Sequence, residues 1–361
     1  MSSIVQRFGV IISGCSGQTT QQQGNCLTAQ LGSKQPYYIV LIVQHDTCVQ
    51  RNQVNSLLVV SCFLMIKVEE KEAHFMPDPN RLLNTLRMAT DACRRTQGRQ
   101  GRVLQLNLAE EVIVVGDLHG HVTNFKKAME YADLNTNPHR HLVIQELIHG
   151  PFTYATGGEQ SHRLIDLFAA LKCLHPHRVH YLLGNHELSQ WTRQAISKNY
   201  VDLNDHFYLG VESAYGLHAP SVYTAYESLF AALPVLIRLP NGVILSHSLP
   251  GAKRLPNWSL EHLFNEQHDE ADVALGGSIH AVVWGRDTAE ETVRTYLDKT
   301  AGQLLISGHI PCDDGYTLPN SLQIILDSKD EQGCLCSIPA NSTVSQGDLV
   351  GRIVKLRQLS G

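Results

Sequence analysis

Four polar motifs in this sequence each follow a run of apolar residues. The first, GDLHGH at residues 116–121, comes directly after the apolar run 112–115. Asp117 and His119 stand two residues apart at the carboxyl end of a predicted buried strand, so both can bind one divalent cation from the same side. The glycines beside them leave room for an anionic substrate to approach the backbone. We therefore expect a metal site at the end of this strand.

In three later motifs, too, an apolar run is followed by a residue whose side chain can bind a metal ion. Asn185 and His186 lie in GNHE (residues 184–187) after the run 179–183. His247 closes the run 243–246, and His309 closes the run 304–308. Asp, His, Asn, His and His in this order, each at the end of a strand, indicate a site for two metal ions.

The elements that must position these residues alternate between strands and helices. Asp78 or Asn80 can cap a helix that carries apolar residues on one face. Strands are predicted at 112–115, 141–146 and 179–183, with helices at 124–132 and around 164–171 between them. This is a βαβ pattern, which predicts a layered α/β domain with its loops gathered at one sheet edge. Strands at 235–239, 243–247, 304–308 and 322–327 predict a second sheet packed against the first, and residues 188–235 read as an inserted helical cap.

Residues 1–75 differ from the rest of the chain. Residues 14–35 are rich in Ser, Gly, Gln and Thr without helical or strand period, which is typical of disorder. We expect a dispensable or spurious N-terminal extension, with Met76 as the true start and 76–361 as the catalytic domain. The alternative is that 1–75 form a small accessory domain.

Composition limits the partners and the setting of this chain. The formal net charge is −5, so electrostatics do not favour a nucleic-acid partner. Nineteen histidines suit metal ligation, and nine scattered cysteines without a CxxC pair favour a reducing, cytoplasmic setting over a disulfide framework. The longest apolar run, 57–66, is far shorter than the roughly 20 residues that span a bilayer, so no membrane is expected.

GDLHGH, GNHE, a strand-terminal His and a Gly-His in this order resemble the calcineurin-like metallophosphoesterases, and among them the phosphoprotein (serine/threonine) phosphatase branch. The residues are also similar to a bacterial group of these enzymes. Supporting stretches are residues 230–234 (FAALP), 283–284 (VW) and 313–316 (DDGY), and the resemblance covers about 110–330. It implies the fold of this family, a four-layer sandwich of two mixed β-sheets flanked by helices.

The resemblance also implies roles for individual residues. Asp117 and His119 would bind the first metal, and Asn185, His247 and His309 the second. His186 would protonate the leaving alkoxide or position the phosphate. Two cations about 3.5–4 Å apart polarise phosphoryl oxygens and convert a bridging water into a hydroxide nucleophile. Mixed oxygen and nitrogen ligands suit Mn, Fe or Zn.

One motif departs from the family pattern. The family's second motif, GDxxDRG, supplies an Asp that bridges the metals, an Asp that orients the catalytic His, and an Arg for phosphate. The corresponding segment 145–150 reads QELIHG. An ungapped match places Glu146 at the bridge and His149 at the orienting position, whereas a match from the Gly-Pro end places Gln145 at the bridge. Arg286 or Arg163 would then supply the missing Arg.

The function predicted from these residues is metal-dependent hydrolysis of a phosphomonoester, in a phosphorylated protein or in a small phosphorylated metabolite. A phosphodiesterase or nucleotide pyrophosphatase is the alternative within enzymes, although residues 308–311 (GHIP) lack the second His of the GHxH pattern common there. A catalytically weak pseudo-phosphatase that binds phosphorylated partners is the alternative outside them, because the second motif is rewritten.

Overall fold

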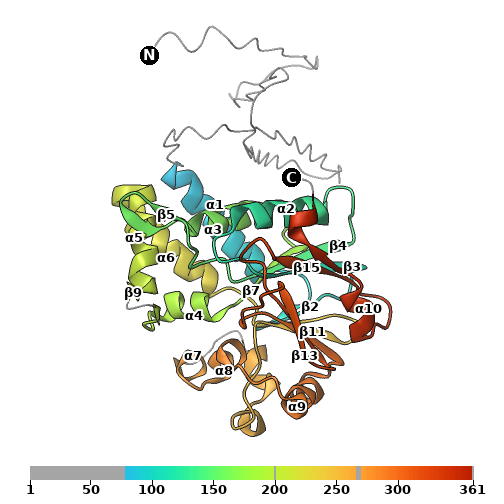
Figure 1. The fold of residues 1–361 in the computed structure, drawn as a ribbon. Helices are drawn as coiled ribbons and strands as arrows, with labels where there is room; N and C mark the ends of the chain where they lie inside the picture. Colours follow the sequence, from blue (N-terminus) through green and yellow to red (C-terminus); the bar gives the residue numbers. More distant parts are fainter. Residues whose placement is uncertain (1–77, 199–200, 266–269, 360–361) are drawn as a thin grey trace, which may run out of the picture. The chain divides into compact units, whose positions relative to one another are not determined.

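The computed structural model describes residues 78–198, 201–265 and 270–359. The predicted extension at 1–75 lies outside these residues. Within them, two large sheets carry the fold (Figure 1). The first sheet has five strands in the order β16 (Ile353–Lys355), β15 (Cys334–Pro339), β3 (Glu111–Asp117), β4 (Arg140–Gln145) and β7 (Val179–Leu182). The second has seven strands in the order β1 (Arg99–Gln100), β2 (Val103–Gln105), β10 (Leu236–Arg238), β11 (Val243–Ser246), β12 (Leu304–Ser307), β14 (Gln323–Leu326) and β13 (Tyr316–Asn320).

Helices cover the outer faces of both sheets. Figure 1 shows α1 (Pro79–Arg94), α2 (Val122–Ala132) and α3 (His162–Leu174) on the side of the five-stranded sheet. On the side of the seven-stranded sheet lie α8 (Ser278–Trp284) and α9 (Glu290–Thr300). The predicted α/β fold, two mixed sheets flanked by helices, is therefore confirmed. The remaining helices are α4 (Asn185–Thr192), α5 (Leu203–Tyr215), α6 (Ala219–Phe230), α7 (Glu270–Val273) and α10 (Gln346–Val350).

The apolar run in β3 fits a strand that is buried on both faces. Val112 and Val114 pack into the core between the sheets, whereas Ile113 and Val115 pack with the residues under the helices. Alternate side chains of a strand point to opposite faces, so a strand covered on both sides needs apolar residues at every position. This is why the predicted strand reads as a continuous run rather than as an alternation.

Gly116 brings the two sheets together at the end of β3. A Cβ at this position would lie 2.4 Å from the backbone carbon of Leu326 in β14, so only glycine allows the two strands to come this close. Asp117 forms an isolated bridge with Asp327 immediately afterwards. The first motif is thereby held at the junction of the two sheets.

Several elements match the prediction closely and others were not foreseen. Asp78 caps α1 through its side chain, which accepts from the backbone N–H of Asn80. The strand predicted at 141–146 ends one residue earlier, at Gln145. The last strands, β15 and β16, return to the first sheet, and β2 joins the second sheet although it precedes β3 in the sequence. Such pairings between distant segments leave no local signal in the sequence.

The segment predicted as a helical cap contains α4, α5 and α6 together with a two-stranded hairpin, β8 (Ser197–Lys198) and β9 (Val201–Asp202). A second hairpin, β5 (Thr153–Tyr154) and β6 (Gly157–Glu159), packs against α5. Among the described residues, none of the helices is both long enough and apolar enough to cross a membrane.

Candidate metal centre

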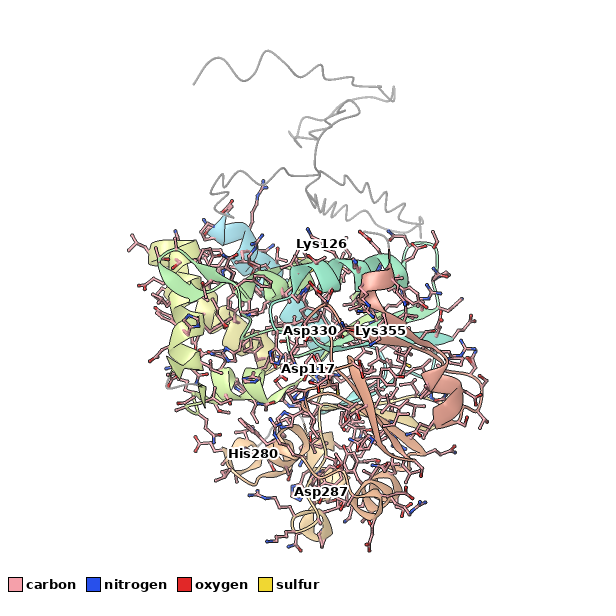
Figure 2. All side chains as sticks on the ribbon, viewed as in Figure 1. Asp117, Lys126, His280, Asp287, Asp330 and Lys355 are labelled. Carbon is pink, nitrogen blue, oxygen red and sulfur yellow. The ribbon has the colours of Figure 1, made fainter. Side chains whose placement is uncertain are left out.

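The predicted ligands converge because their strands end at the same place. β3, β4 and β7 are parallel to one another, and β11 and β12 are parallel in the other sheet. Their carboxyl ends carry Asp117, Glu146, Asn185, His247 and His309. Figure 2 shows Asp117 at the centre of this region, between the two sheets. The meeting of the two sheets brings together residues that are almost 200 positions apart in the chain, as the 2.7 Å hydrogen bond between His309 N–H and Asp117 shows.

Four residues of this region have a backbone conformation that is uncommon for residues other than glycine. The φ angles are 40° at His119, 43° at Glu146, 65° at His149 and 67° at His309. Left-handed backbone costs roughly 1–3 kcal/mol per residue and is typical of functional sites, where the surrounding structure holds it in place. All four residues lie in the loops that follow β3, β4 and β12.

Glu146 is the centre of the cluster. One group of mutually close ligand atoms comes from His119, Glu146 and His186, and a second comes from Glu146, His247 and His309. The Glu146 carboxylate lies 3.3 Å from Nε2 of His247, 3.7 Å from Nε2 of His119 and 3.8 Å from Nε2 of His186. Glu146 is thus the residue that the two groups share.

Asp117 borders the same cluster. Its Oδ2 accepts a hydrogen bond of 2.7 Å from the backbone N–H of His309, while its Oδ1 is buried and has no hydrogen-bond partner among the described residues. A Cβ on Gly308 would come within 2.1 Å of that oxygen, so the glycine keeps the space around it open. A buried carboxylate oxygen without a partner is expected where a cation binds.

The histidines are oriented so that one ring nitrogen faces the cluster. Nδ1 of His119 lies 2.8 Å from the carbonyl oxygen of Ile148, and Nδ1 of His247 lies 3.2 Å from Oε1 of Gln145. A backbone carbonyl oxygen can only accept, so Nδ1 of His119 carries the proton and its Nε2 presents a lone pair to the cluster. His247 Nε2 also lies 3.0 Å from Oδ1 of Asn185.

Burial sets the charge state of the cluster. Desolvation raises the pKa of Asp117 and of Glu146 well above the usual carboxyl range, and the neighbouring carboxylates, Glu146 for Asp117 and Glu187 for Glu146, raise them further. Desolvation lowers the pKa of His119 to about 4 and that of His309 to about 2. The imidazoles are therefore neutral at neutral pH, as metal ligation requires, and a cation would favour the ionised carboxylates.

The sequence profile of the calcineurin-like phosphoesterases matches residues 111–313, more than half of the chain. The chain belongs to this family. It is 27% identical over 241 residues to a probable serine/threonine-protein phosphatase of Encephalitozoon cuniculi (strain GB-M1), an alignment that covers 62% of this chain and 47% of the relative. The chain thus spans about half the length of the curated relative it matches.

A solved structure with a TM-score above 0.5 has the same fold. A protein serine/threonine phosphatase from Saccharomyces cerevisiae, described as similar to human phosphatase PP5, aligns with a TM-score of 0.56 at 14% identity and covers 77% of this chain and 88% of its own. A cold-active protein-tyrosine phosphatase of a psychrophilic Shewanella species aligns with a TM-score of 0.49 at 14% identity, covering 73% and 84%.

Calcineurin-like phosphoesterases use divalent metal ions, and the residues of this chain fit such ions. The fit rests on the unpartnered buried atoms Oδ1 of Asp117 and Nε2 of His309, and on a donor set of carboxylate oxygens and neutral imidazoles. Gln145, the alternative for the bridging position, is instead engaged with Val115 and His247. This geometry favours Glu146 as the bridge.

His186 is the second residue of α4, directly after Asn185. Its Nε2 faces Glu146, its Nδ1 is buried without a hydrogen-bond partner in the described chain, and its side chain is 19% exposed. His119 is similarly exposed, at 20%, whereas the side chain of His247 is fully buried. His119 and His186 therefore line the opening of the site.

The remaining predicted site residues differ in their surroundings. Arg286 is exposed, makes no hydrogen bond or ion pair with any described residue, and its charge lowers the pKa of Glu146 and His247. Arg163 is also exposed but donates to Gln160, on the side of α3. The structure thus places Arg286, rather than Arg163, within electrostatic reach of the cluster.

Two buried glutamates near the cluster were missed by the sequence analysis. Glu187 is fully buried and accepts hydrogen bonds from the backbone N–H groups of Leu147 and Ile148 and from the hydroxyl of Tyr181. It holds the loop that carries Glu146. The GNHE motif contained Glu187, but no spacing indicated its partners. The second glutamate, Glu159, contacts His149, and nothing in its local sequence marks it.

Proposed function

We propose that this chain is a phosphomonoesterase that uses two divalent cations (Mn, Fe or Zn) and acts on phosphoserine or phosphothreonine in proteins, or on a small phosphorylated metabolite. The observation that carries the proposal is the position of Glu146 in both groups of potential ligands. The similarity to a probable serine/threonine-protein phosphatase supports the protein substrate.

The proposed ligands divide into two sets that share one carboxylate. Asp117 and His119 would hold the first cation, and Asn185, His247 and His309 the second, with Glu146 bridging them. When bound, two cations held by these residues would polarise the phosphoryl oxygens and activate water as the nucleophile at neutral pH.

His186 is the residue proposed to act on the leaving group. Its partly exposed ring lines the opening of the site, while its Nε2 stays 3.8 Å from Glu146. Burial lowers the pKa of His186 well below its usual range, so the ring is neutral at neutral pH and would donate through a single N–H. A phosphoester that enters from solvent would meet this ring, which would protonate the departing alkoxide or position the phosphate. Arg286 is exposed, and its charge lowers the pKa of Glu146. Its guanidinium would bind the phosphate oxygens.

The test is hydrolysis of p-nitrophenyl phosphate by the full chain with Mn²⁺, with and without a chelator. We expect activity that depends on the metal and a content close to two ions per chain. Bis-p-nitrophenyl phosphate, a diester, is the parallel substrate that detects a phosphodiesterase. A chain that holds one ion or none and hydrolyses neither compound would refute the proposal and support the pseudo-phosphatase alternative.

A further inference from the structure

The turn between β14 and β15, residues 327–333, lies against the end of β3. Asp327 forms the backbone bridge with Asp117, and the backbone N–H of Ser328 donates to the carbonyl oxygen of Asp117 at 2.9 Å. The hydroxyl of Ser328 accepts from the backbone N–H of Gly116 at 2.9 Å. The start of this turn is therefore attached directly to the strand that carries the first proposed metal ligand.

Helix α2 holds the same turn through Asn124. The buried side-chain amide of Asn124 donates to the carbonyl oxygens of Ser328, at 2.8 Å, and of Asp330, at 2.7 Å. Figure 2 shows Asp330 close to Asp117. The backbone of Lys329 lies between these two bonded residues, so its position is fixed by a strand and a helix. Groups held by such elements are placed more precisely than groups on free loops.

The side chain of Lys329 is anchored by Asp327, whose side chain is only 4% exposed. Oδ2 of Asp327 accepts from the ammonium group of Lys329 and, at 3.0 Å, from the backbone N–H of Cys312, while Oδ1 accepts from the backbone N–H of Lys329 at 3.2 Å. An ammonium group has three donors, and among the described residues this one has the single partner Asp327. The side chain of Lys329 is 32% exposed, so its other donors can reach a ligand that comes from solvent. Because the pairing already restricts this long side chain, binding costs less rotamer entropy.

Lys329 lies within electrostatic reach of His119, which lines the opening of the site. Burial lowers the pKa of His119 most, and the charge of Lys329 lowers it further. The charge of Arg286 acts in the same way on His247 and His309, whose pKa values burial also lowers. Two cations from different segments of the chain thus act on different histidines of the cluster.

We propose that Lys329 binds a terminal oxygen of the substrate phosphate and makes the site selective for phosphomonoesters over phosphodiesters. At neutral pH a phosphomonoester carries a charge of about −1.5 to −2 and three terminal oxygens, whereas a diester carries a single charge and two terminal oxygens. A cation beside the site therefore strengthens the binding of the monoester more. The selectivity rests on the proposed function, whereas the binding of phosphate by Lys329 does not.

The first test measures the binding of orthophosphate to the full chain in the presence of Mn²⁺ by calorimetry, together with metal content. Lys329→Gln removes the charge and should raise the Kd about tenfold, a moderate loss because the side chain is partly exposed. Lys329→Arg keeps the charge and should stay within about threefold of wild type. Lys126→Gln, an exposed residue of α2, changes the net charge equally and is the matched control, expected within about twofold.

Three outcomes of this test would overturn the proposal. In the first, Lys329→Gln binds orthophosphate as tightly as Lys126→Gln, so that Lys329 contributes no more than an average surface charge. In the second, Lys329→Gln loses bound metal, which would make any weaker phosphate binding an effect on the cluster. In the third, the wild-type chain does not bind orthophosphate. None of these readouts depends on enzymatic activity.

The second test compares kcat/KM for p-nitrophenyl phosphate and for bis-p-nitrophenyl phosphate in the same four proteins. Lys329→Gln should lower kcat/KM for the monoester about tenfold, mainly through a higher KM, and that for the diester less than about threefold. Equal losses for both esters would contradict the selectivity. A wild type that binds orthophosphate through Lys329 and hydrolyses neither ester would refute the proposed function and leave the phosphate contact standing. Wild-type kcat/KM for the monoester in Lys329→Gln would refute the role of Lys329 alone.

Discussion

Glu146→Gln is the substitution that tests the centre of the site most sharply. The side chain keeps its shape and loses its charge, and it belongs to both groups of potential ligands. In the metal-free protein, burial already raises the pKa of this carboxyl far above its usual range, so the charged form is disfavoured there. The substitution should therefore leave the metal-free fold as stable as before, or more stable.

The magnitude follows from the loss of at least one cation. An ion present at 100 times its Kd stabilises the folded chain by about 2.7 kcal/mol. Because 1 kcal/mol shifts Tm by about 2–4 °C in a domain of 150–250 residues, Glu146→Gln should remove about 5–10 °C of the metal-induced rise in Tm. Loss of a Lewis-acid contribution of about 3–4 kcal/mol lowers kcat roughly 10²- to 10³-fold.

The assay combines three measurements on the same preparations: metal content after gel filtration, Tm with and without Mn²⁺, and kcat for p-nitrophenyl phosphate. Glu130→Gln on the exposed face of α2 is the matched control and should behave as wild type. Gln145→Ala should lower activity only about tenfold, through the hydrogen bond that it makes to His247. If Gln145→Ala loses a metal and Glu146→Gln does not, the bridge is Gln145 and our assignment is wrong.

Three further predictions concern the same region. Asp117→Asn should abolish turnover without lowering the Tm of the metal-free protein, and near wild-type rates would contradict its role as a ligand. Because burial raises the pKa of Asp117 and Glu146, binding of Mn²⁺ should release protons and tighten as pH rises, which calorimetry in two buffers of different ionisation enthalpy measures. Gly210→Ala should displace the backbone of Glu159 and lower the free energy of unfolding by about 1–3 kcal/mol, and an unchanged Tm would contradict the close contact between β6 and α5.

The parts of the fold that the sequence predicts are those encoded by local patterns. The run before Asp117 identifies a buried strand because apolar residues at every position require cover on both faces. The positions of β2, β15 and β16 could not be predicted in this way, since each pairs with a strand far along the chain. Their apolar residues fit more than one partner, and only tertiary packing selects among them.

The same distinction applies within the candidate site. Strand-terminal ligands follow from the rule that parallel strands end at one edge, so five of the six proposed metal ligands could be placed from spacing and type. Which ring nitrogen of each histidine faces the cluster depends instead on backbone and side-chain acceptors, such as the carbonyl of Ile148 beside His119. These acceptors are positioned by turns with positive φ, which the sequence does not mark when the residue is not glycine.

The segment 145–150, which differs from the family's second motif, shows which information a sequence match alone does not contain. Aligned by position, His149 looks like the loss of an acidic residue. In the structure Nδ1 of His149 contacts a buried carboxylate, that of Glu159, which lies ten residues later in the chain. The backbone of Glu159 packs directly against Gly210 of α5. A histidine with a carboxylate on Nδ1 offers a lone pair on Nε2, so it can accept a proton as a carboxylate can, but from one ring further away. The carboxylate that the aligned motif lacks is thus present in the structure one side chain further from the cluster, on a strand that packs against α5.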